Sequence, residues 1–98
     1  MNSSSPKFIA DVTLYPTAQG GRRAPTPPNR FGCPCKAAKD DEQSWDCQLL
    51  LAGTPLSPGD TRRLEIMFLT PELAVPALRK APKFFLWELG IIGEAMFI

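Results

Sequence analysis

The sequence predicts an all-β domain of about six short strands, packed as a small antiparallel barrel or sandwich. Apolar residues alternate with polar ones in several stretches, which is typical of half-buried strands. The 98 residues include eleven prolines and seven glycines, a composition that favours short strands and tight turns over long helices. The length and the 44% hydrophobic content fit one globular domain, expected over residues 7–98 after a flexible tail at 1–6.

The N-terminal half predicts two strands with a long loop between them. The first strand is indicated by Phe8, Ala10, Val12 and Leu14, which share one face. Residues 16–30 have no periodicity and are rich in Gly, Pro and Thr, so we expect a loop of a length that is often functional. Residues 31–36 are a second strand, and the proline at position 34 indicates an edge strand or a bulge.

The middle of the chain predicts two more strands. An acidic turn around residues 40–42 precedes a third strand over residues 45–51. The sequence Ser-Pro-Gly-Asp at 57–60 has the composition of a turn and leads into a fourth strand at 64–68.

The C-terminal third predicts two closing strands after an ambiguous segment at 70–82. Thr70 followed by Pro71 suits a helix start, but Pro76 and Pro82 limit such a helix to about one turn. Residues 84–89 and 91–98 are the last two strands, joined at Gly90.

The order of these motifs resembles the C-terminal β-barrel, the third domain, of translation elongation factor Tu. In that family a strand leads to a Gly-Gly-Arg loop with a proline close by. A Pro-Gly-Asp turn then introduces a strand ending near a proline, and a Phe-rich strand, an acidic residue and glycines close the domain. The matching residues are Gly20, Gly21, Arg22 and Pro25, then Pro58, Gly59 and Asp60, then Pro71, and finally Phe84, Glu88, Gly90 and Gly93. The resemblance spans residues 7–98 and implies a closed six-stranded antiparallel barrel, here as a stand-alone domain.

The resemblance also implies binding partners, but one difference from the family's sequence pattern argues against one of them. In the family this domain packs on two others, touches the T-stem of aminoacyl-tRNA and meets the exchange factor. The closing hairpin of the family carries an Arg-Thr pair where this chain has Ile91 and Ile92, flanked by glycines. An apolar pair thus replaces a phosphate-binding cation, which argues against tRNA binding in the family's mode. Nothing resembles a P-loop, so GTPase activity is excluded and no nucleotide is expected.

The loop after the first strand is a candidate anion or RNA site. Gly20 and Gly21 can turn backbone N–H groups outward beside Arg22 and Arg23, and Arg30 can join the same rim. The alternative is that the glycines only shape the exit from the strand and the arginines pair with surface acids. RNA binding is disfavoured by the net charge of +1.

Three cysteines raise the question of a thiol or metal site. We expect Cys33 and Cys35 to point to opposite faces of a strand, which disfavours a bond between them. Zinc prefers a fourth ligand, and the chain has neither a second Cys-x-x-Cys nor a histidine. We therefore expect the cysteines to be core residues, with Cys47 on the same face as Trp45 and Leu49, and no metal.

The last two strands carry apolar residues on both faces. We expect Phe85, Trp87, Ile91 and Ile92 to form a second apolar surface, which is either covered by the 70–82 segment or is a protein interface anchored by Trp87.

These observations predict a non-enzymatic protein without a cofactor. The chain lacks histidine, so the most common general base is missing, and no catalytic constellation is present. No leader or membrane span is recognised, and we expect a cytoplasmic protein that does not engage membranes. The favoured function is a protein-binding module with a protein partner or a second copy. The alternatives are a tRNA- or rRNA-binding protein using the basic loop, and a thiol or metal protein using the three cysteines.

Overall fold

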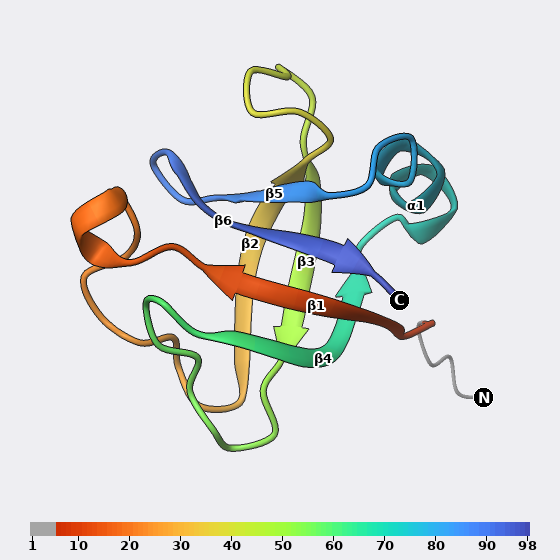
Figure 1. Ribbon diagram of the computed structural model, residues 1–98. Helices are drawn as coiled ribbons and strands as arrows, with labels where there is room; N and C mark the ends of the chain where they lie inside the picture. The colour runs from red at the N-terminus through yellow and green to blue at the C-terminus, as the bar shows by residue number, and fades with distance from the viewer. Residues whose placement is uncertain (1–5) are drawn as a thin grey trace.

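A computed structural model describes residues 6–98, which form a closed six-stranded antiparallel β-barrel with one short α-helix (Figure 1). The strands are β1 (Phe8–Leu14), β2 (Arg30–Lys36), β3 (Trp45–Leu50), β4 (Thr61–Phe68), β5 (Phe84–Trp87) and β6 (Ile91–Phe97). The helices are the 3-10 helix η1 (Thr17–Gln19) and α1 (Pro71–Leu78). The all-β barrel expected from the sequence is confirmed; the expected tail, residues 1–6, lies outside the described residues except for Pro6.

The barrel closes because β1 pairs with two strands that are distant in the sequence. The strand order around the barrel is β1-β4-β3-β2-β5-β6, and Ala10 of β1 lies opposite both Leu64 of β4 and Phe97 of β6. In Figure 1, β2 and β3 cross behind β1 and β6, so the strands enclose a common interior. No sheet edge is left among the six strands, which removes the unpaired backbone groups that an open sheet would expose.

Strand alternation fills the interior with apolar side chains. Buried residues alternate with more exposed ones along most of the strands, as Val12 and Leu14 do on β1 and Phe84 and Leu86 do on β5. The rings of Phe8, Phe68, Phe84 and Phe97 pack together with centroids 4.9–6.3 Å apart. The apolar residues of the sequence alternation therefore face the interior of the barrel, and the polar ones face outward.

The two glycines after β1 build the turn that follows η1. Gly20 has a φ of +92°, in the left-handed region that glycine tolerates without steric cost. Gly21 donates its backbone N–H to the carbonyl of Pro16, and an added Cβ at Gly21 would overlap the carbonyl oxygen of Tyr15. The glycine pair is thus required by backbone conformation at one position and by close approach at the other.

The 70–82 segment forms a longer helix than expected. Helix α1 has eight residues, starting with Pro71 at its first turn and continuing through Pro76. Ala74 and Leu78 are buried in the barrel core, and this burial holds the helix together although Pro76 lacks a backbone N–H donor. In Figure 1, α1 lies beside the end of β4 and the start of β5.

Strand β2 differs from the expectation of an edge strand. It begins at Arg30, and it pairs with β3 along its length and with β5 at Cys35 and Lys36. Pro34 is tolerated because it lies just before the two residues that pair with β5.

Strand β5 ends at Trp87, because Leu89 and Gly90 take positive φ values of 58° and 148° in the turn before β6. Within residues 6–98, no helix has the length and hydrophobicity needed to cross a membrane.

Candidate functional site

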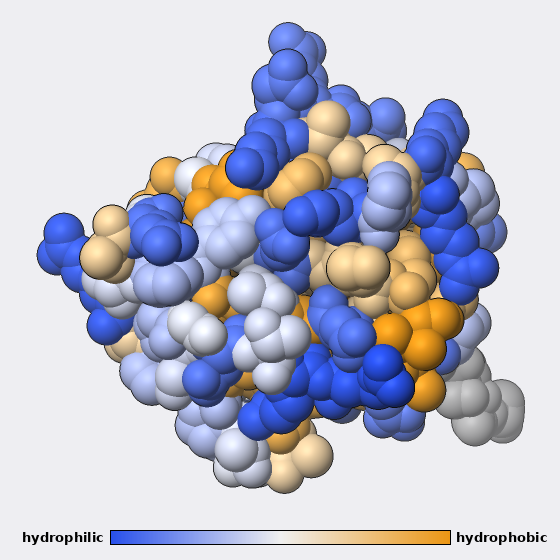
Figure 2. All heavy atoms as spheres, in the orientation of Figure 1, coloured by the Kyte–Doolittle hydropathy of each residue, from blue (hydrophilic) through white to orange (hydrophobic). Residues whose placement is uncertain are grey.

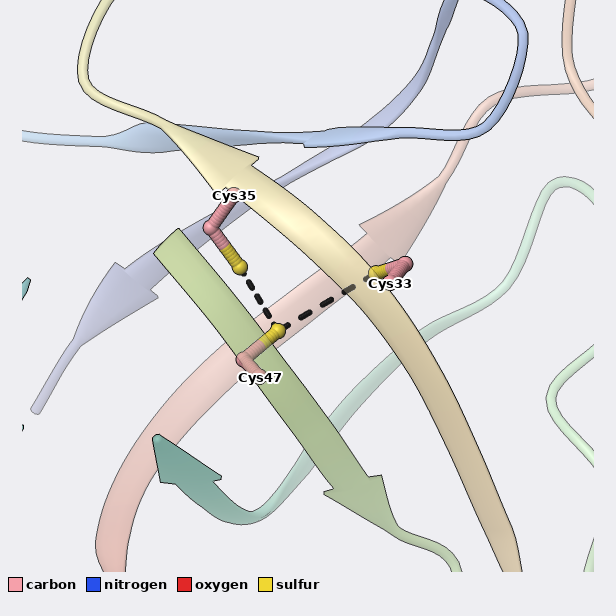
Figure 3. Close-up of side chains that lie close together, drawn as sticks. All are labelled: Cys33, Cys35 and Cys47. Carbon is pink, nitrogen blue, oxygen red and sulfur yellow. Dashed lines mark hydrogen bonds between the residues drawn. The ribbon is translucent and has the colours of Figure 1, made fainter. Parts of the chain in front are cut away.

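The three cysteine thiols meet inside the barrel (Figure 3). Cys33 and Cys47 are directly opposite each other on β2 and β3, and Cys35 is two residues further along β2. The sulfur atoms of Cys35 and Cys47 are 2.6 Å apart, those of Cys33 and Cys47 are 4.0 Å apart, and all three lie within 4.8 Å of one another. Each side chain is at most 6% exposed, and all three are present as thiols. We call these three residues the thiol cluster.

The expectation that Cys33 and Cys35 point to opposite faces is wrong. Side chains two positions apart on a strand share a face, so both cysteines point inward and Pro34 between them points outward. Cys47 is a core residue on the face of Leu49, as expected, but that face is also the one that holds the other two thiols.

The environment of the thiol cluster lowers the pKa of one cysteine and raises the pKa values of the other two. Hydrogen bonds from Cys35 and then from Cys47 lower the pKa of Cys33 to about 5, although burial acts to raise it. The backbone N–H of Trp87 and the charge of Arg22 also lower this pKa. Burial raises the pKa of Cys35 well above its usual range. Hydrogen bonding to Cys33, then to Cys35, and burial do the same for Cys47. The arrangement favours a thiolate at Cys33 held by two thiol donors.

The predicted anion site at the arginines is not assembled as expected. Arg22 forms an ion pair with Glu88 (Nε to Oε1, 3.1 Å), and its guanidinium lies 4.7 Å from the ring centroid of Phe31. Arg30 donates to the side-chain oxygen of Gln48 at 3.1 Å, and Arg23 is exposed. Arg22 thus pairs with an acid, as in the alternative in which the arginines pair with surface acids, whereas Arg30 contacts an amide.

Phe85 and Trp87 lie on the outer face of β5, and lysines lie over their rings. The ammonium of Lys36 is 5.6 Å from the centroid of Trp87. The ammonium of Lys39 is 5.4 Å from the centroid of Phe85 and 5.9 Å from that of Tyr15. These separations are within the range of cation–π attraction. We call these five residues the aromatic–lysine face.

The other two residues of the predicted apolar strip have different places. Ile91 is half-buried beside Trp87, its partner in the β5–β6 pairing, whereas Ile92 is 4% exposed and belongs to the core. A residue with so little exposed surface cannot anchor a partner, so Ile92 is removed from the predicted interface. Lysines from β2 and from the loop after it lie over the rings of Trp87 and Phe85.

One carboxylate lies beside the aromatic–lysine face. The hydroxyl of Tyr15 donates to Glu94 at 2.9 Å, and the ammonium of Lys83 pairs with the same carboxylate at 3.0 Å. Burial, and then the neighbouring Glu94, raise the pKa of Tyr15 to about 12. Burial acts to raise the pKa of Glu94, but the hydrogen bonds from Lys83 and Tyr15 and the charges of Lys83 and Lys39 together lower it below its usual value. These contacts fix the tyrosine ring at the edge of the face.

Figure 2 shows a second apolar area, where β6 ends near the C-terminus. Ile9 of β1 and Met96 and Ile98 at the end of β6 are 46–61% exposed, and the backbone N–H of Ile98 donates to the carbonyl of Ile9. The three side chains are aliphatic, without an aromatic ring or a charge over them in the contacts described. This area is the natural comparison surface for the aromatic–lysine face.

Sequence reasoning missed Tyr15, Lys36 and Lys39. Lys36 is predictable in part, because alternation from an inward Cys35 places it outward. Its position over Trp87 depends on the pairing of β2 with β5, and that pairing joins residues about fifty positions apart. Tyr15 and Lys39 are in loops, where no periodicity indicates their neighbours.

Comparison with protein-family models and with curated proteins found no match for this chain.

Proposed function

We propose that this protein is a non-enzymatic binding module, related to the third domain of elongation factor Tu, that docks a protein partner through the aromatic–lysine face. One observation carries the proposal: three half-buried rings, Tyr15, Phe85 and Trp87, are grouped on the outside of the barrel under Lys36 and Lys39. Outward-facing residues of a barrel normally meet water, so three grouped aromatic rings call for a partner.

The residue types fit a protein interface. Tyr and Trp are enriched among the residues that contribute most to protein binding, because they bury a large area and lose little conformational freedom. Phe85 and Trp87 belong to a paired strand, and the hydroxyl of Tyr15 is hydrogen-bonded to Glu94. The three rings are therefore held in place before binding. The barrel therefore presents a rigid surface.

The two lysines indicate the chemistry of the partner. Lys36 and Lys39 place two positive charges over the rings; among the described residues neither lysine is in an ion pair, although the charge of Lys39 acts on Glu94. An acidic side chain of the partner can pair with a lysine while an apolar group covers the ring. We therefore propose an acidic protein segment as the partner.

RNA binding is the second candidate, favoured by the same surface. Aromatic rings with nearby cations can stack unpaired bases and attract the phosphate backbone. Against this, Arg22, which the sequence predicted as part of an RNA site, is already paired with Glu88. The net charge of +1 also provides no general attraction for a polyanion.

The test is a capture experiment from source-cell lysate with tagged protein at low and high salt, in which both bound protein and bound RNA are identified. Trp87→Ala removes one of the three rings, and Met96→Ala, on the comparison surface, is the matched control. We expect one protein to be retained at both salts by the wild type and by Met96→Ala. Loss of that protein with Trp87→Ala, by at least about 1 kcal/mol in affinity, is the expected result.

Two outcomes would contradict the proposal. If Trp87→Ala folds and retains the same protein unchanged, this face is not the docking surface. If RNA is retained at low salt and released at high salt, with no protein retained at either, the second candidate replaces the first.

A further inference from the structure

We propose that the thiol cluster is a three-sulfur binding site for a single soft metal ion, with Cu(I) as the ion whose preferences the site meets. The site is Cys33, Cys35 and Cys47, held inside the barrel by the β2–β3 pairing (Figure 3). This inference does not depend on the proposed docking function, because the cysteines lie on the inner face and the aromatic–lysine face is outside.

The spacing of the sulfur atoms suits one shared ion. A metal–sulfur bond of about 2.3 Å places ligand sulfurs about 4 Å apart around a three-coordinate centre. Cys33 and Cys47 already have this separation, at 4.0 Å, and the whole cluster lies within 4.8 Å. Cys35 and Cys47, at 2.6 Å, have to separate by somewhat more than 1 Å, which a small side-chain rotation provides. The backbone pairing already brings the three ligands together.

The number of ligands selects the metal. Structural zinc sites are almost always four-coordinate, and catalytic ones complete the set with water. The cluster contains three sulfurs, the chain contains no histidine, and burial of all three side chains limits access of water as a fourth ligand. A set of soft sulfur ligands without a fourth donor suits Cu(I) better than zinc.

A positive group lies next to the site. The charge of Arg22 acts on the Cys33 sulfur, and the Nη1 atom of Arg22 is buried without a hydrogen-bond partner among the described residues. Thiolates around a monovalent ion carry a net negative charge, which a low-dielectric interior penalises unless it is compensated. The guanidinium of Arg22, which also pairs with Glu88, supplies part of that compensation.

The test is a titration of the reduced protein with Cu(I) under anaerobic conditions, against bathocuproine disulfonate as a competing coloured chelator. X-ray absorption of the loaded protein then counts the sulfur neighbours of copper. We expect the protein to withdraw about one Cu(I) per chain from the chelator and to show three sulfur neighbours. Binding should also raise the unfolding temperature, because the assembled site exists only in the native state.

Single substitutions assign the ligands. Cys33→Ala, Cys35→Ala and Cys47→Ala should each weaken Cu(I) binding by about 100-fold or more, because loss of even an outer-shell partner costs about 10- to 100-fold. Met96→Leu removes an exposed thioether and should leave binding unchanged. Circular dichroism of each metal-free variant shows whether it has folded, and the wild-type titration decides the question even if a variant does not fold.

Several results would overturn the inference. Failure of the wild-type protein to compete with the chelator removes the site, and unchanged binding by Cys33→Ala removes the three-sulfur geometry. Displacement of bound Cu(I) by equimolar zinc contradicts the choice of metal. A disulfide between Cys35 and Cys47 that persists under reducing conditions would show that these two sulfurs form a structural bond and are not metal ligands.

Discussion

Cys33, Cys35 and Cys47 come from two adjacent strands, and side-chain alternation brings all three to the inner face of the barrel. The sequence supports half of this result, since positions two apart on a strand must share a face. The other half depends on the register that places Cys47 opposite Cys33, and no local pattern specifies that register. The glycine pair was more predictable, because a positive φ and a close backbone approach are needs that residue type alone can indicate.

Gly21→Ala should destabilise the barrel more than Gly20→Ala. A methyl group at position 21 would overlap the backbone oxygen of Tyr15, and we expect a loss of about 2–3 kcal/mol in the free energy of unfolding. At position 20 there is open space, so the cost is only that of a positive φ, about 1 kcal/mol. Urea unfolding of both variants measures the difference, and equal losses would contradict this account of the turn.

The ionisation of Tyr15 reports on the edge of the aromatic–lysine face. Tyr15 is the only tyrosine in the chain, so the ultraviolet absorbance of tyrosinate follows this residue alone. We expect an apparent pKa of about 12, raised first by burial and then by Glu94. Glu94→Gln removes the negative charge and should shift the titration to lower pH, still above the usual value because burial remains. An identical titration in both proteins would show that the tyrosine does not contact Glu94.

The β-strands were predicted better than the segments between them. Each strand carries its own alternation, so its existence and its inner face can be recognised locally. The length of helix α1 was underestimated because Pro76 and Pro82 argue against a longer helix, whereas burial of Ala74 and Leu78 stabilises it in the fold. Such tertiary stabilisation cannot be inferred from the segment alone.

Strand β5 offers a direct test of the assignment of faces. Phe84 is fully buried against Phe68 and Phe97, and its neighbour Phe85 is half-buried outside. Phe84→Ala should lower the free energy of unfolding by about 3–5 kcal/mol. Phe85→Ala should cost about 1 kcal/mol, the typical value for a point substitution. Chemical denaturation compares the two variants; the opposite order would mean that β5 is turned over.

Over the whole molecule, one seam of the barrel joins the two candidate sites. Where β2 pairs with β5, Cys35 lies opposite Leu86 on the inside and Lys36 lies opposite Phe85 on the outside. A single register therefore orients a thiol inward and a lysine toward the aromatic rings outward. Closure of the barrel depends on pairings between distant strands, which is why the sequence predicted the strands but suggested their closed order only through a resemblance.

The most direct test of the docking face is site-specific photocrosslinking in source-cell lysate. A photoreactive phenylalanine derivative would replace Phe85 in one protein and Met96, on the comparison surface, in another. The account predicts a crosslink to one protein from position 85 and none from position 96. A crosslink to a protein only from position 96, or to RNA alone from position 85, would contradict it.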